Sequence, residues 1–432
     1  MIPPFQHATL SARFFQPLLA TCSSPLTAPF LRSCPALPDA HWLLFGSLRA
    51  LETFPSGRAF LQHLSSIHPD APSRSLFFES LKSPRRLALS SAANHALCQQ
   101  VDGSLSHRLA AFPDLAGWHL FAGDGHYHAA AAHDQRDPER ERKFATGHFF
   151  GLNLRSHSLF HLTVADQLER KQEHDLRALK RLEIAALRRD APKGHQVLWV
   201  WDRAALDFGF WRELKNRAGV YFLSRDKENT KLQTIGIREI DFADPQNDGV
   251  QRDEFVRSAG GVQLRRIHYF DTLSGESFVF VTNEFTLAPG LLAHLYRLRW
   301  NLEKVFDLLK NKLCEIKAWA TSPIAKSAQA QFLCLTHNLL LQLEGALAED
   351  DDIHNEAEIK RRAQRLQLAA ANLKSAPPNT RAVKPSIPFP IAFTQCLTQR
   401  SVKFIRWLRS YLFSSLSWAD LIAPLRRIYA TS

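Results

Sequence analysis

Four side chains suited to phosphate chemistry recur at helical spacing in the second half of the chain. Tyr296, Arg299, Glu303 and Lys310 follow one another at steps of three, four and seven residues. Residues at these steps lie on one face of an α-helix. A carboxylate beside a phenol, a guanidinium and an ammonium suits a metal ion bound to a scissile phosphate, because the cations balance the remaining negative charge. The spacing therefore indicates phosphodiester chemistry.

A surface helix with no catalytic role is the alternative interpretation of this window. Pairs of charged residues at i,i+4 are common on solvated helices whose other face is core. The window supplies six apolar residues for such a face: Leu295, Leu298, Leu302, Val305, Phe306 and Leu309. Further carboxylates elsewhere in the chain are needed to favour the catalytic interpretation.

Two aspartates upstream supply candidate partners for Glu303. A two-metal site needs several converging carboxylates, because hard divalent cations prefer oxygen ligands. Asp124 lies at the end of a predicted strand, between two glycines that would let backbone and substrate approach closely. Asp202 directly follows the predicted strand that ends at Trp201. If the two strands are neighbours in one sheet, the two acids meet, and a helix crossing nearby brings in Glu303.

The elements around these acids follow a recognisable order. We expect strands at 118–122, 148–154 and 159–164, a charged helical stretch at 167–189, a strand at 196–201, a helix near 210–218 and a strand at 220–224. This order is that of a ribonuclease-H-like domain. Further β-like pieces at 230–241, 262–270 and 277–282 predict a β-rich insertion, and Pro289 and Gly290 mark the start of the helix that carries Glu303.

The predicted fold class is therefore α/β, with a ribonuclease-H-like mixed-sheet core, a β-rich insertion, and helical N- and C-terminal regions. The expected segments are 1–112 (helical), 113–225 (core, first part), 226–287 (insertion), 288–348 (core, second part) and 349–432 (helical and basic). The first segment is either a DNA-contacting module or a structural cap. In the last, Lys403, Arg406 and Arg409 share a helical face that would follow a DNA backbone or remain solvated.

The composition narrows the class of protein. The 432 residues carry 54 Lys and Arg against 42 Asp and Glu, a net charge of +12, which favours a polyanionic partner without distinguishing DNA from RNA or anionic lipid. The six cysteines form no C-x2-C pair, so neither a zinc ribbon nor a disulfide framework is expected. No apolar run reaches the roughly 18 residues of a membrane span, and no secretory signal is evident, so we expect a cytoplasmic protein.

The spaced residues resemble the Y-x2-R-x3-E-x6-K signature of DDE transposases of the insertion-sequence-four family. The segment 197–203, Val-Leu-Trp-Val-Trp-Asp-Arg, is similar to the strand-Asp-Arg element of that family, and Phe280-Val-Thr-Asn283 is similar to its approach to the third acid. The resemblance covers roughly residues 118–345. It favours Asp202 and Glu303 over the rival carboxylates Asp207 and Asp307.

The resemblance implies a DNA transposase that cleaves the inverted-repeat ends of an insertion sequence and joins their 3′-hydroxyl ends to target DNA. It implies that Asp124, Asp202 and Glu303 are catalytic and hold two Mg²⁺ or Mn²⁺ ions. Tyr296, Arg299 and Lys310 would grip phosphates near the transposon end, with Trp300 stacking or packing beside them. It further implies double-stranded DNA as partner, a homodimer on paired ends, no membrane, and a bacterial protein that associates with the nucleoid when bound to DNA.

Two other functions share the same acids. One is a ribonuclease-H-like nuclease without strand transfer, and the other is an inactive, transposase-derived DNA-binding protein. The histidines His126, His128 and His133 have no role implied by the resemblance. With Asp134 they could form a soft-metal site, although short histidine runs more often serve as polar surface or hydrogen-bond donors.

Overall fold

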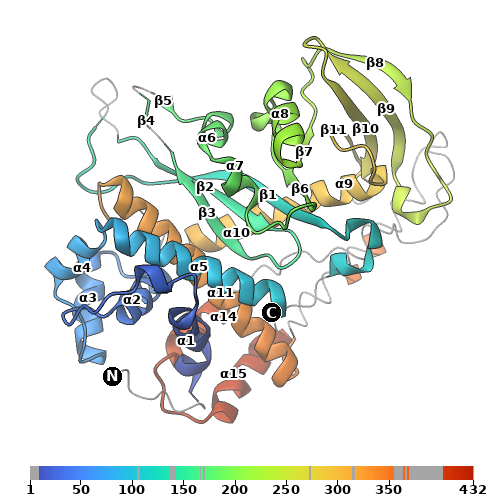
Figure 1. The fold of residues 1–432 in the computed structure, drawn as a ribbon. Coiled ribbons are helices and arrows are strands. Elements are labelled where there is room, and N and C mark those ends of the chain that lie inside the picture. Colours follow the sequence, from blue (N-terminus) through green and yellow to red (C-terminus); the bar gives the residue numbers. More distant parts are fainter. Residues whose placement is uncertain are drawn as a thin grey trace.

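A nine-stranded mixed sheet runs through the molecule, with helices packed along it (Figure 1). The computed structural model describes residues 9–104, 108–136, 143–165, 167–168, 171–271, 274–313, 317–354, 363–364, 367–368 and 402–431. The large sheet consists of β1 (Trp118–His128), β2 (Thr146–Asn153), β3 (Leu159–Val164), β6 (Gln196–Val200), β7 (Val220–Arg225), β8 (Leu232–Ile237), β9 (Val250–Ser258), β10 (Gln263–Asp271) and β11 (Glu276–Thr282). Two short strands, β4 (Gln167–Leu168) and β5 (Lys171–Gln172), pair separately.

The strand order β3-β2-β1-β6-β7-β11-β10-β9-β8 confirms the predicted fold class. β1, β2 and β3 pair antiparallel, and β6 and β7 continue parallel to β1, as expected of a ribonuclease-H-like core. The β-rich part extends the same sheet, because β11 pairs antiparallel with β7. The sequence did not predict β9, since Gln251-Arg-Asp-Glu254 interrupts its apolar pattern, although Asp253 and Glu254 are buried in the fold.

Helices form the rest of the described structure. Those before the sheet are α1 (Leu10–Ala20), α2 (Asp39–Leu51), α3 (Gly57–Ile67), α4 (Arg74–Ser80) and α5 (Pro84–Ser104); those after it are α9 (Pro289–Leu298), α10 (Trp300–Asn311), α11 (Pro323–Asp350), α14 (Val402–Tyr411) and α15 (Trp418–Thr431). Within the core, the expected charged helix is two short helices, α6 (Asp175–Arg181) and α7 (Ile184–Arg188), and α8 spans Phe208–Ala218. Short 3₁₀ helices lie at 21–23, 28–30, 108–111, 113–115, 203–205 and 245–247.

The N-terminal helices share one apolar core with α11. α2 and α5 pack directly on α11, and buried residues of all three belong to the same cluster. The contact is close at Gly46, where an added Cβ would lie 2.0 Å from the Phe332 ring. These helices are therefore part of the apolar core of the molecule. DNA contact by this region stays a prediction.

The C-terminal helices also attach to the body. Arg409 donates hydrogen bonds to the carbonyls of Leu51 (2.7 Å) and Lys312, so it docks α14 and is not solely a solvated basic residue. The proline-rich stretch 377–390, Cys314 and Cys396 lie outside the described residues. The four described cysteines are free thiols. Among the described residues, no helix combines the length and the apolar character that crossing a bilayer requires.

Candidate active site

The first two predicted acids follow corresponding positions of adjacent parallel strands. β1 and β6 pair in parallel with Ala122 opposite Val200, and Asp124 and Asp202 each lie two residues further along the chain. The prediction that these strands are neighbours is confirmed. β1 continues to His128 and pairs Asp124 with Phe150 of β2, so the prediction that Asp124 lies at the end of its strand was wrong. Asp202 begins the 3₁₀ helix at 203–205 and accepts the Ala204 N–H at 2.8 Å, while Asp124 accepts the Gly125 N–H at 2.8 Å.

The glycines around Asp124 make room for other parts of the protein. A Cβ at position 123 would lie 2.3 Å from the Trp201 ring, and one at position 125 would lie 2.9 Å from Oδ1 of Asp175. Any larger side chain would displace these neighbours. The groups that approach these glycines are side chains, among them Asp175 at the start of α6, and close approach of a substrate stays a prediction.

The helix that carries Glu303 is interrupted. α9 ends at Leu298 and α10 begins at Trp300, so the prediction of a single helix across this spacing was wrong. The Arg299 N–H bonds to the Tyr296 carbonyl at 3.1 Å, three residues back, which tightens the chain at this point. Tyr296 and Glu303 consequently belong to different helices, with Arg299 at their junction.

Arg299 joins two of the predicted acids. Its Nη1 lies 2.9 Å from Oδ2 of Asp124, and its Nη2 lies 3.0 Å from Oε1 of Glu303, with the arginine side chain 7% exposed. The guanidinium thus draws α10 against β1 and balances both carboxylates. Within the described part of the chain, no three His, Cys, Asp or Glu side chains are close enough to form a metal-binding group.

A third aspartate shares the electrostatic environment of Asp124 and Asp202. Burial raises the pKa of Asp124 to about 6; Arg299 opposes this rise, and the charges of Asp175 and Asp202 add to it. Burial likewise raises the pKa of Asp175, and Asp202 contributes. The sequence analysis missed Asp175, because it belongs to no motif and only the fold brings it beside Gly125.

The chemistry of these donors matches a hard divalent cation, whereas their positions in the described structure do not bring three of them together. Asp124, Asp175, Asp202 and Glu303 offer only carboxylate oxygens, which Mg²⁺ and Mn²⁺ prefer over the softer ligands of other metals. The raised pKa of Asp124 means that burial disfavours its charged form. A cation beside this carboxylate would stabilise its charged form and lower its pKa, as Arg299 does in part.

The predicted DNA-binding residues lie in different surroundings. Tyr296 is 6% exposed, and its ring centroid lies 4.8 Å from that of Phe280. The guanidinium carbon of Arg299 also lies over this ring, 5.8 Å from its centroid, so Tyr296 packs against that arginine. Trp300 is 55% exposed, and Lys310 is exposed one residue before the end of α10. Trp300 and Lys310 are thus accessible to a nucleic acid, and Tyr296 is largely enclosed.

The two rival carboxylates have other partners. Asp207 caps α8 by accepting the Phe210 N–H at 3.0 Å and pairs with Lys180 at 2.6 Å. Asp307 pairs with Lys312 at 2.7 Å and accepts the Asn311 amide at 2.7 Å. Both carboxylates therefore stabilise local structure.

The histidines of β1 pack inside the protein. His126 stacks on Phe306 of α10 with centroids 4.5 Å apart, and His128 stacks on His148 at 5.3 Å. Both are buried, so the interpretation of these two as polar surface was wrong, whereas the alternative of a hydrogen-bond donor fits His128, whose Nδ1 lies 3.1 Å from the Ala129 carbonyl oxygen. Asp134 pairs with Lys326 at 3.0 Å, and the described residues contain no soft-metal cluster.

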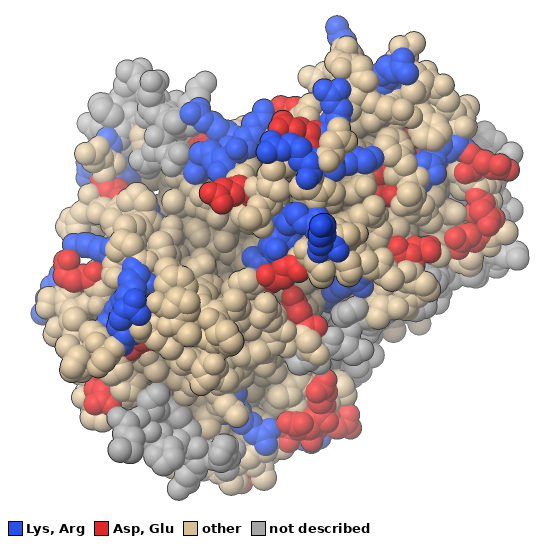
Figure 2. All heavy atoms as spheres, viewed as in Figure 1, with Lys and Arg blue, Asp and Glu red and all other residues tan. Residues whose placement is uncertain are grey.

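Basic side chains gather near the acids. Figure 2 shows lysines and arginines along the upper middle of one face, over the region of α6, α7 and α8. In this region Arg177, Arg203 and Arg212 are exposed and make no ion pair with any described residue. Arg177 lies two residues after Asp175, and Arg203 follows Asp202. This arrangement is typical of a surface that binds a polyanion beside a cluster of carboxylates.

Comparisons with known proteins agree with this geometry. The family model described as "Transposase DDE domain" matches residues 117–339, just over half of the chain, and the match includes all three predicted acids. The chain is also 26% identical over 121 residues to the protein named "Putative transposase y4zB" of Sinorhizobium fredii (strain NBRC 101917 / NGR234). That match covers 27% of this chain and 33% of the relative, so the chain spans about a third of the relative's length.

Proposed function

Because the chain belongs to the Transposase DDE domain family, we propose that it is a DNA transposase of the insertion-sequence-four type, which cleaves inverted-repeat ends and joins them to target DNA. The observation that carries the proposal is the position of the acids. Asp124 and Asp202 follow paired residues of adjacent parallel strands, and Arg299 holds Glu303 beside Asp124. The Tyr296, Arg299, Glu303 and Lys310 spacing supports assignment to this type.

Asp124, Asp202 and Glu303 would hold two Mg²⁺ or Mn²⁺ ions. Bound there, the ions would lower the pKa of an attacking water or DNA 3′-hydroxyl and stabilise the leaving oxygen. The protein supplies the carboxylates from within β1, from the residue that follows β6 by two positions, and from α10. Asp175 adds negative charge to the same environment and strengthens its preference for a divalent cation.

The cationic and aromatic residues would position DNA at these acids. Arg299 supplies a buried guanidinium whose planar donors match a phosphate as well as a carboxylate. Lys310, Arg177 and Arg203 offer exposed positive charge for the DNA backbone, and Trp300 offers an exposed ring for stacking. A homodimer on paired ends, with the terminal helical segments 1–112 and 349–432 sharing the DNA contacts, completes the proposal.

A cleavage and joining assay tests this function. A supercoiled plasmid carrying the inverted repeats that flank the gene is incubated with the protein and Mg²⁺, beside the Glu303→Gln variant. Cleaved and joined products from the native protein alone support the proposal. Nicking without joining would support the nuclease, and specific end binding without cleavage would support a DNA-binding protein that has lost activity.

A further inference from the structure

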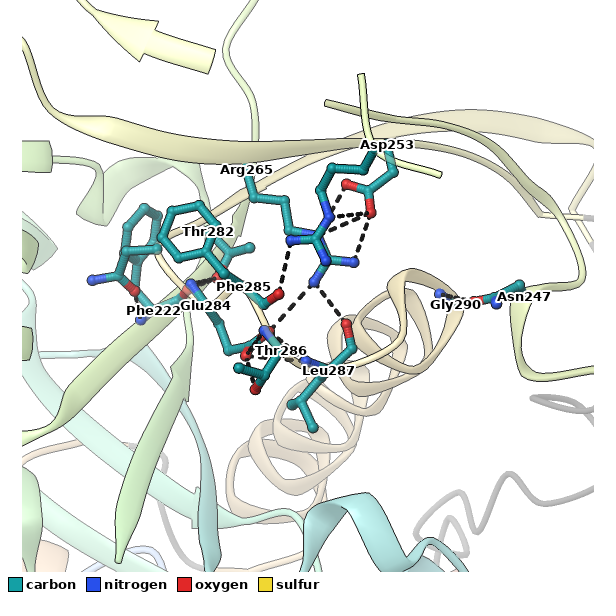
Figure 3. Close-up of polar contacts among 12 residues, drawn as sticks. Phe222, Asn247, Asp253, Arg265, Thr282, Glu284, Phe285, Thr286, Leu287 and Gly290 are labelled. Atoms are coloured by element: carbon teal, nitrogen blue, oxygen red, sulfur yellow. Dashed lines mark hydrogen bonds and ion pairs between the residues drawn. The ribbon is translucent and has the colours of Figure 1, made fainter. Parts of the chain in front are cut away.

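A short segment connects the last strand of the insertion to the helices of the active site. Residues 283–288 leave β11 and lead into α9, which in turn leads to Arg299 and Glu303. This segment has no regular secondary structure of its own, so other groups must satisfy its backbone and set its position. Figure 3 shows the charged side chains of Arg265 and Asp253, from the insertion, beside it.

Arg265 of β10 links this segment to the insertion. The side chain is fully buried, and its Nε and Nη2 donate to Asp253 of β9 at 2.9 and 2.8 Å. Its Nη1 donates to the Leu287 carbonyl at 2.7 Å and lies 3.4 Å from Oε2 of Glu284 (Figure 3). Leu287 lies two residues before α9, so one guanidinium joins two insertion strands to the start of the catalytic helices.

Further side chains hold the same segment. Glu284 accepts the Leu287 N–H at 3.1 Å and the Thr286 hydroxyl at 2.5 Å. Arg238 donates to the Phe285 carbonyl at 2.7 Å and lies 3.3 Å from Asp253. The side chains of Arg238, Arg265 and Glu284 therefore satisfy backbone groups of this segment, in place of the hydrogen bonds that a strand or helix would make.

The first turn of α9 is held by a second contact with the insertion. The Gly290 N–H bonds to Oδ1 of Asn247 at 3.2 Å, and an added Cβ at position 290 would lie 1.8 Å from the Gln246 carbonyl oxygen. No side chain can be accommodated there without moving the backbone. The position of α9 is thus fixed against the insertion at two points.

The adjacent residue Arg266 forms an ion pair of the same kind without reaching α9. Its Nε donates to Glu254 of β9 at 2.8 Å, and its Nη2 donates to the Thr234 hydroxyl at 3.0 Å. Consecutive residues of a strand point to opposite faces, so Arg265 and Arg266 tie the same two strands on different sides. Only Arg265 extends the connection to Leu287.

We propose that Arg265 is a positioning residue, which sets the place of α9 and α10 and thereby of Arg299 and Glu303 relative to Asp124 and Asp202. Burying three charged groups costs desolvation energy that their mutual attraction does not reliably repay, so stability alone does not account for this network. Arg265 itself contacts none of the acids of the site. The catalytic part of this inference rests on the proposed transposase function.

The test compares Arg265→Lys with Arg266→Lys. Lysine keeps the positive charge, but a single ammonium lacks the planar fork that reaches Asp253 and Leu287 together. Hydrogen exchange of residues 285–298 should be about tenfold faster in Arg265→Lys than in the native protein, with the exchange of α2 and α5 unchanged. The kcat of end cleavage should fall about 10- to 100-fold with KM unchanged, since small displacements of catalytic groups have effects of this size. Arg266→Lys should show neither change.

Native exchange and native kcat in Arg265→Lys, or equal effects of the two substitutions, would overturn the inference. If Arg265→Lys fails to fold, the combined Arg265→Met, Asp253→Asn and Glu284→Gln variant removes all three buried charges together, and Arg238, which is 22% exposed, keeps its hydrogen bond to the Phe285 carbonyl. It should show the same exchange and kcat changes. The exchange measurement needs no activity, so a native protein without cleavage would contradict the proposed function and leave this comparison decisive for Arg265.

Discussion

Replacing Asp124 with asparagine should stabilise the metal-free protein while abolishing catalysis. The carboxylate is only 19% exposed, and burial raises its pKa from the ordinary 3.8 to about 6 in spite of the ion pair with Arg299. The folded state therefore holds the proton more tightly than the unfolded state does. Asparagine resembles the protonated form and avoids the cost of ionising this group at neutral pH.

The expected size of the effect follows from the shift in pKa. A rise from 3.8 to about 6 corresponds to about 3 kcal/mol of lost stability once the folded-state group is ionised. This contribution of Asp124 to stability is fully present below pH 3.8, falls as the pH rises through about 6, and is lost at pH 7. The free energy of unfolding of Asp124→Asn should accordingly exceed that of the native protein by about 3 kcal/mol at pH 7 and by little near pH 4.

Denaturant unfolding with a chelator present, from pH 4 to pH 8, measures this difference. Asp207→Asn is the matched control, because Asp207 caps α8, pairs with Lys180 and has a lowered pKa. The control should lose stability at pH 7 where Asp124→Asn gains it. Equal or lower stability of Asp124→Asn at pH 7 would refute the assignment of Asp124 as a carboxylate ionised against the cost of burial.

Two further substitutions separate DNA contact from metal binding. Lys310→Ala should weaken binding to end DNA and reduce the slope of log K against log salt concentration by about 1, because one exposed phosphate contact is lost. Titration calorimetry of the same variant should show native Mn²⁺ binding. An unchanged salt slope would count against the phosphate contact. Asp175→Asn should lower Mn²⁺ affinity about tenfold by removing negative charge beside Asp124 and Asp202. Calorimetry with Asp207→Asn as control measures this affinity. Native Mn²⁺ affinity in Asp175→Asn would show that Asp175 is not part of the metal site.

The sheet was largely predictable because each strand carries a local signal. The apolar runs before Asp124 and Asp202 identify two strands, and the order of elements implies that they are neighbours, which the register of Ala122 against Val200 bears out. β9 escaped prediction because buried ion partners replace the apolar pattern there, with Asp253 paired to Arg265 and Glu254 to Arg266. A sequence shows such charges as surface residues until their partners are known.

The parts of the site that the sequence did not predict depend on long-range contacts. The spacing of Tyr296, Arg299 and Glu303 suits a continuous helix. In the structure the helix is interrupted at Arg299, whose guanidinium bonds to Asp124. Asp175 becomes part of the site only because α6 packs against the 3₁₀ helix after Asp202. Neither contact leaves a periodic pattern in the sequence.

The most direct test of the central claim is strand transfer from a precut transposon end. A duplex carrying the inverted repeat and a free 3′-hydroxyl is incubated with target plasmid, Mg²⁺ and the protein, beside a 3′-deoxy end and beside the Glu303→Gln variant. We expect joined products only with the native protein and the 3′-hydroxyl end. Joining by Glu303→Gln at the native rate, or no joining by the native protein to any target, would contradict the account.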